Sequence, residues 1–153
     1  MSAFEIRDNS QQALAEISKI TNIALKVIAK QAESYAKLNV TDASREGIDL
    51  TQHGEYDNSR VDRGQLRNSI TGVVVDGAAY IGSNIPYAPY HELGTGIYAS
   101  QPGGRQSPWV YYNRKLGQYM KTNGLYPLHF LKNSVANHLD EYKRIFEEIL
   151  SQR

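Results

Sequence analysis

The stretch that decides the fold runs from Val61 to Gly96 and reads VDRGQLRNSITGVVVDGAAYIGSNIPYAPYHELGTG. Its beginning has the pattern of a helix start. Asp62 can cap a helix, and Gln65 stands three residues later, where a capping box places a glutamine. The pattern therefore predicts a short helix that ends near Ser69.

A hairpin and an aromatic turn follow this helix. Ile70 to Val75 is rich in β-branched residues, and the Asp76-Gly77 pair is a strong signal for a two-residue hairpin loop. We therefore expect a return strand over Ala78 to Gly82. The run from Pro86 to Leu93 is predicted to form one aromatic turn of helix. Gly94 follows it, where glycine favours a left-handed stop.

Bulk composition limits the classes of protein to which the chain can belong. It has 153 residues, a formal net charge of +1 and no cysteine. We therefore expect a single domain over 1–153, without disulfide bonds or thiolate chemistry. The balanced charge gives no general argument for binding nucleic acid or membranes. No apolar run approaches the roughly 20 residues of a membrane-spanning helix, and the first ten residues lack an apolar signal core. We expect a soluble intracellular product.

Long helices are expected near both ends of the chain. Apolar residues recur every three or four positions between Gln11 and Leu38, which predicts one long helix. Its surplus apolar surface is either buried under a sheet or packed against another subunit. A second helix is expected after Pro127, with an apolar stripe of Leu131, Val135, Leu139, Tyr142, Ile145 and Ile149.

Strands and loops fill the space between these helices. Trp109 to Tyr112 is a predicted strand, while Gln118 to Lys121 fits either a strand or a short helix. The segment 39–60 is polar, aperiodic and predicted to be a long mobile loop, which either orders on a partner or is a solvated insertion. A second loop is expected over 96–107. The chain is therefore assigned to the α+β class, with a small, mainly antiparallel sheet flanked by the two helices.

Two motifs give the chain a family resemblance. V-D-x-G-x-L-R-x-S begins at Val61, and Y-A-x-Y-H-E-x-G-T begins at Tyr87, one hairpin further on. Together with Gly124, Pro127, Phe130 and Leu131, these motifs resemble the neck or tail-completion proteins of long-tailed bacteriophages, which are minor tail components. The motif residues, to which the resemblance gives structural roles, are Asp62, Gly64, Leu66, Arg67, Ser69, Tyr87, Tyr90, His91, Glu92, Gly94 and Thr95. The chain differs from the family pattern at Arg63, at Leu93 and in the inserted pair Leu128-His129.

This resemblance implies a structural protein of the virion, made in the host cytoplasm. Such proteins join the filled head to the tail as rings around the DNA channel, as hexamers or dodecamers. The implied partners are other copies of the chain, head-completion or connector proteins, and tail-terminator or tail-tube proteins. Packaged DNA would pass through nonspecifically, and no membrane would be involved.

Patterns for catalysis, cofactors or metal ions are weak in this sequence. His91 and Glu92 are adjacent, and neighbours on a helix point about 100° apart, which is poor spacing for one metal ion. Neither Ser69 nor Ser107 lies in a G-x-S-x-G context. Gly94-Thr95-Gly96 lacks the lysine of a phosphate-binding loop. We therefore expect no enzymatic activity, no cofactor, no metal ion, and a structural role for His91.

The most informative charge pattern is local. Leu93 to Leu139 contains five basic residues, no acidic one, and several aromatic residues. This composition suits a protein interface or, as the alternative function, a nonspecific nucleic-acid-binding surface. The candidates for contact with a neighbour or with DNA are Arg105, Trp109, Tyr111, Arg114, Lys115 and Lys121. Docking of this stretch on the acidic segment 39–60 of another copy would give head-to-tail association, which can close into a ring.

Overall fold

The computed structural model describes residues 8–45, 63–113 and 117–152. The elements are α1 (Ser10–Arg45), α2 (Arg63–Ser69), β1 (Ile70–Val75), β2 (Ala78–Ser83), α3 (Ala88–Leu93), the 3-10 helix η3 (Gly96–Tyr98), β3 (Trp109–Asn113), β4 (Gln118–Thr122), α4 (Phe130–Ala136) and α5 (Leu139–Ser151). The α+β class expected from the sequence is confirmed. The described strands form two separate antiparallel pairs, β1–β2 and β3–β4.

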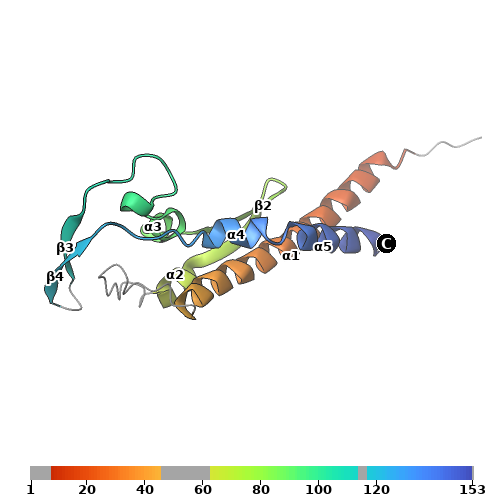
Figure 1. Cartoon of the computed structure of the whole chain (residues 1–153). Helices are drawn as coiled ribbons and strands as arrows, with labels where there is room; N and C mark the ends of the chain where they lie inside the picture. Colours follow the sequence, from red (N-terminus) through yellow and green to blue (C-terminus); the bar gives the residue numbers. More distant parts are fainter. Residues whose placement is uncertain (1–7, 46–62, 114–116, 153) are drawn as a thin grey trace, which may run out of the picture.

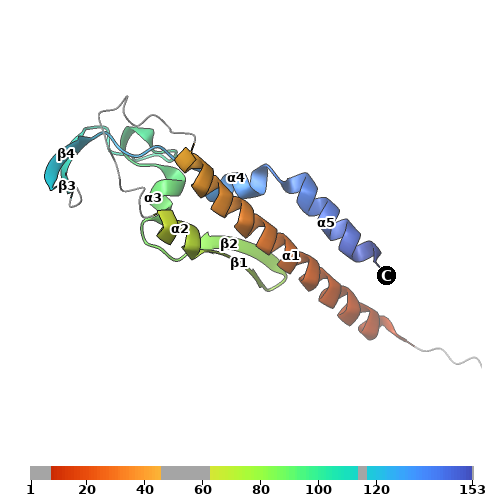
Figure 2. The same cartoon turned by 90° about the horizontal axis from the view of Figure 1, so that it is seen from below.

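Helix α1 runs along the length of an elongated molecule (Figure 1). The β1–β2 hairpin lies along one side of this helix, and α4 and α5 lie along another side (Figure 2). The β3–β4 hairpin projects at one end of the molecule, while the start of α1 and the end of α5 lie at the other end. The two ends are therefore far apart along the molecule.

Helix α1 is longer than the apolar periodicity predicts. The prediction ended at Leu38, whereas the helix continues to Arg45 and spans about 54 Å at 1.5 Å per residue. The predicted loop over 39–60 is therefore wrong for residues 39–45. Val40 is fully buried and extends the stripe of Ala36, while the Asn39 side chain donates a hydrogen bond to the Phe130 carbonyl at 3.1 Å. The rest of that predicted loop lies outside the described residues.

The first hairpin follows its sequence signals closely. Asp76 and Gly77 both have positive φ, 50° and 75°, as a two-residue loop of the mirror-image type requires. Val75 pairs with Ala78, and the return strand reaches Ser83, one residue beyond the prediction. The local sequence therefore determines this turn.

The main hydrophobic cluster lies where the second half of α1 meets α2, α3 and the start of α4. Its buried members are Ala36, Val40, Leu66, Ile70, Ala88 and Phe130. The first turns of α1 contribute nothing to this cluster. Leu14 is 66% exposed and Ile17 is 46% exposed, although both belong to the predicted apolar stripe. The described residues leave these two side chains uncovered.

The predicted C-terminal helix is broken into α4 and α5. The break occurs at Asn137 and His138, without a proline or glycine, and the His138 ring stacks on Tyr35 of α1 with ring centroids 3.5 Å apart. Val135 and Leu139, both members of the predicted apolar stripe, are exposed. A single uninterrupted apolar stripe was therefore the wrong prediction here.

Candidate functional site

A side chain in the aromatic turn of the second motif is hydrogen-bonded to the start of helix α4. The carboxylate of Glu92 in α3 accepts hydrogen bonds from the backbone N–H groups of Leu131, at 2.8 Å, and Lys132, at 3.0 Å. These N–H groups belong to the first turn of α4, where backbone donors lack partners within the helix and a negative charge is favourable. Glu92 therefore acts as a helix cap supplied from a distant segment.

Backbone hydrogen bonds tie the same turn to the chain that leads into α4. The Leu128 N–H donates to the His91 carbonyl at 2.7 Å, and the His129 N–H donates to the Glu92 carbonyl. Thr95 donates its N–H to the Leu125 carbonyl and accepts the Leu125 N–H on its hydroxyl, at 2.8 and 2.9 Å. The inserted residues Leu128 and His129 are therefore part of this connection, and the helix starts after them.

Two glycines permit the close approach of these segments. An added Cβ would lie 1.9 Å from the Asn123 carbonyl oxygen at Gly96 and 2.0 Å from the Thr95 carbonyl oxygen at Gly124. Gly94 has the expected positive φ, 73°, but its ψ of 176° places it outside the left-handed helical region. That conformation is essentially restricted to glycine.

The aromatic residues of the motif divide between packing and exposure. His91 is buried, and its ring and that of Tyr87 form a T-shaped pair with ring centroids 5.7 Å apart. The Tyr87 hydroxyl donates to the Gln65 side-chain oxygen at 3.2 Å. Tyr90 is exposed. The turn is therefore connected to α2 through Tyr87.

In the first motif, Leu66 and Ser69 contribute to packing and hydrogen bonding. Leu66 is buried, and the Ser69 hydroxyl donates to the Leu66 carbonyl at 2.6 Å and lies 2.7 Å from the Ser83 hydroxyl. Gly64 and Arg67 are exposed. The predicted cap Asp62 lies outside the described residues. The second motif and the end of α2 thus meet at the hydrophobic cluster.

A buried carboxylate that the sequence analysis did not single out joins α1 to β1. Glu33 accepts the Gly72 N–H at 2.9 Å and pairs with Lys30 at 2.8 Å and Lys37 at 2.6 Å. The hydrogen bonds from Lys30 and Lys37 lower the pKa of Glu33 from 4.5 to about 2, against the opposing effect of burial. A glycine inside a strand is a sequence signal of close backbone approach.

A second missed connection lies at the break between α4 and α5. The Tyr142 hydroxyl donates to the Ser134 carbonyl at 2.5 Å, and the Tyr35 hydroxyl donates to the Glu141 carboxylate at 2.7 Å. Burial, with smaller effects of Tyr35 and Glu141, raises the pKa of Tyr142 to about 12. The first contact joins α5 to α4, and the second joins α5 to α1.

The described basic and aromatic candidates differ in their surroundings: Arg105 and Lys121 are exposed, whereas Trp109 and Tyr111 are partly buried. Arg105 lies over the ring of Trp109 at 5.4 Å and donates to the Ser107 hydroxyl. Arg114 and Lys115 lie outside the described residues. Among the described candidates, Lys121 is therefore the exposed basic residue that belongs to the β3–β4 hairpin.

Neither a metal centre nor a membrane span is evident in the part of the chain that the structure describes. No group of three or more histidine or acidic side chains there could hold a metal ion. None of the helices there combines the length and the apolar character needed to cross a membrane.

Comparison with known proteins returned no relative for this chain. No family model, no curated protein and no solved structure matches it.

Proposed function

We propose that this chain is a structural subunit of the neck of a long-tailed bacteriophage, where copies form a ring around the DNA channel during head–tail joining. The observation that carries this proposal is the distribution of contacts in the molecule. The motif residues Glu92, Thr95 and Ser69 form side-chain hydrogen bonds to neighbouring segments, while uncovered apolar side chains lie at the two far ends.

Uncovered apolar surface of this kind favours assembly over catalysis. Val110, Tyr112 and Tyr119 are exposed on the β3–β4 hairpin, and Leu14 and Ile17 are exposed on α1. Contiguous exposed apolar surface marks interaction sites. The carboxylate of Glu92, which the sequence places beside His91, is engaged by two backbone N–H groups of α4.

The partners in this proposal are other copies of the chain in a hexameric or dodecameric ring. Above and below the ring would lie head-completion or connector proteins and tail-terminator or tail-tube proteins. Packaged DNA would pass through the ring without sequence-specific contact, because phosphate contacts carry no sequence information.

A nonspecific nucleic-acid-binding module is the rival function. The observation in its favour is the acid-free stretch from Leu93 to Leu139, which presents Lys121 beside exposed tyrosines. Binding of this kind weakens steeply with salt, because phosphate contacts release counterions.

Light scattering over a concentration series, with negative-stain electron microscopy, tests the proposal. We expect a discrete species whose mass is six or twelve times 17.2 kDa, seen as a ring with an open channel. A monomer at every concentration that binds short duplex DNA in a strongly salt-dependent way would replace the assembly function with the rival one.

A further inference from the structure

The β3–β4 hairpin, here called the arm, is a sheet of two strands. It comprises Trp109–Asn113 and Gln118–Thr122 and projects from the end of the molecule (Figure 1). An isolated two-stranded hairpin is at best marginally stable in water and needs further strands or a helix packed on it. Within the described residues, neither strand has a second strand neighbour. Among the described residues, the arm is therefore an isolated pair of strands with one face open to solvent.

The strand register identifies that free face. Val110 pairs with Lys121 and Tyr112 pairs with Tyr119, so these four side chains lie on the same side of the arm. Val110 is 62%, Tyr112 52% and Tyr119 76% exposed, and Lys121 is also exposed. The two tyrosine rings pack edge to face with centroids 5.2 Å apart. We call this side the outer face of the arm; it is an apolar strip with a cation at its border.

A complementary surface lies on α5. Leu139, Phe146 and Leu150 recur at spacings of seven and four, which places them on one side of the helix. Leu139 and Leu150 are exposed and Phe146 is partly exposed. We call these three residues the α5 strip. It spans about 17 Å along the helix, comparable with a strand of five residues.

The charges of the two surfaces are opposite. The sequence from Trp109 to Thr122 contains three basic residues and no acidic one, and one of them, Lys121, lies on the outer face of the arm. Helix α5 carries four acidic residues against two basic ones, and Asp140 and Glu147 each follow directly after a member of the α5 strip. Lys143 lies 3.7 Å from the Asp140 carboxylate. Such complementarity fixes orientation and favours encounter between partners.

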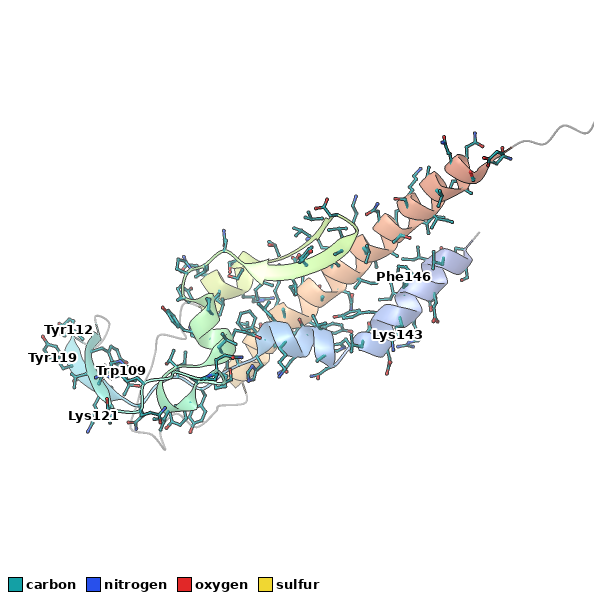
Figure 3. All side chains as sticks on the ribbon, turned by 90° about the horizontal axis from the view of Figure 1, so that it is seen from above. Trp109, Tyr112, Tyr119, Lys121, Lys143 and Phe146 are labelled. Atoms are coloured by element: carbon teal, nitrogen blue, oxygen red, sulfur yellow. The ribbon has the colours of Figure 1, made fainter. Side chains whose placement is uncertain are left out.

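The arm cannot reach the α5 strip of its own chain. Figure 3 labels Trp109, Tyr112, Tyr119 and Lys121 at one end of the molecule, and Lys143 and Phe146 towards the other end. Contact between these surfaces therefore needs two copies. The resulting interface joins different surfaces head to tail, the kind of interface that closes into rings.

We propose that the outer face of the arm docks on the α5 strip of a second copy of this chain. This inference rests on the proposed function and names the interface by which the ring forms. It replaces the segment 39–60 with α5 as the acidic partner of the basic stretch. A nucleic-acid ligand fits less well, because Tyr112 and Tyr119 pack against each other and Val110 adds an aliphatic surface.

Cross-linking tests this geometry directly, since the chain has no cysteine and any introduced thiol is unique. Tyr119→Cys and Leu150→Cys variants with different tags are mixed and treated with a short thiol cross-linker. We expect mixed dimers of the two variants. The matched control is Tyr80→Cys, which replaces another exposed tyrosine, on β2, and should give few mixed dimers with Leu150→Cys.

Association measurements give a second, independent test. Tyr119→Ser should weaken association at least about tenfold, because tyrosines at interface centres contribute strongly, whereas Tyr80→Ser should leave association unchanged. Lys121→Glu should weaken association more at low salt than at high salt. Combining Lys121→Glu with Glu147→Lys should restore part of the loss.

The outcomes separate this inference from the proposed function. The docking mode is overturned if a ring forms but its arms cross-link to one another. It is also overturned if Tyr119→Cys links to Leu150→Cys no more often than the Tyr80→Cys control does. Either result leaves the assembly function intact. A strict monomer without cross-links overturns both. Unchanged mass together with lost DNA binding in Tyr119→Ser would assign the arm to nucleic acid and overturn the docking proposal.

Discussion

The carboxylate of Glu92 lies 2.8 Å from the backbone nitrogen of Leu131, 39 positions later in the chain. Most helix caps come from the residue directly before the helix. Here the residue at that position, His129, has a left-handed conformation with φ of 48° and makes no side-chain cap hydrogen bond. Glu92, in the segment from His91 to Gly96, therefore caps α4 in place of His129 and positions this helix.

Replacement of Glu92 should destabilise the protein. Glu92→Ala leaves two N–H donors of α4 without their carboxylate, and we expect the free energy of unfolding to fall by about 1–2 kcal/mol. Glu92→Gln should lose less, because one side-chain oxygen remains. Urea unfolding followed by circular dichroism measures the change. The exposed Glu148→Gln on α5 is the control, and equal stability of Glu92→Ala and this control would refute the capping role.

Gly72 should not tolerate a side chain. A Cβ at Gly72 would lie 2.3 Å from the Ala29 carbonyl oxygen on α1, so Gly72→Ala should push β1 away from the helix and cost about 1–3 kcal/mol. Gly82→Ala is the matched control, because Gly82 lies on the paired strand and has no atom within 4 Å of its added Cβ. Thermal unfolding compares the two variants. Similar melting temperatures for both would mean that β1 does not need its close approach to α1.

Acid should destabilise the protein partly through Glu33. The folded-state pKa of Glu33 is depressed to about 2, so its contribution is fully present above the ordinary value of 4.5 and is lost as the pH falls towards 2. We expect about 1–2 kcal/mol to be lost in this window, since the exposed Lys30 is partly screened by solvent.

A Glu33→Gln variant isolates this effect. Its unfolding free energy should be lower than that of the wild type at pH 6 and should change less between pH 4.5 and 2. Denaturant titrations at several pH values measure the difference. Parallel pH profiles for wild type and variant would remove Glu33 from the acid response.

Tyr142 should contribute through its hydroxyl at neutral pH. Tyr142→Phe removes the donor to the Ser134 carbonyl, and we expect a loss of about 1 kcal/mol. The pKa of Tyr142 is raised to about 12, so the wild type should also lose stability as the pH rises from 10 to 12, and the variant should lack this part of the loss. Tyr119→Phe, on the exposed arm, is the control. Equal unfolding free energies of both variants at pH 7 would contradict the expected role.

Local signals predicted the local elements. The Asp76-Gly77 pair determines its turn because both residues adopt positive φ at little cost, and the β-branched run before it forms the expected strand. The aromatic run Trp109 to Tyr112 also lies within a strand, and Gln118 to Lys121 is resolved as a strand rather than a helix. Expectations for Asp62, Arg114 and Lys115 stay predictions.

The sequence by itself determined the secondary structure wherever the decisive interactions join neighbours in the chain. Only the tertiary structure decided that Glu92 caps α4 and that Glu33 accepts the Gly72 N–H. It also decided that Tyr35 stacks on His138 at the break between α4 and α5. Leu14 and Leu139 likewise stay exposed despite their apolar periodicity. The physical reason is that periodicity records which side of a helix is apolar, whereas burial depends on which distant segment covers that side.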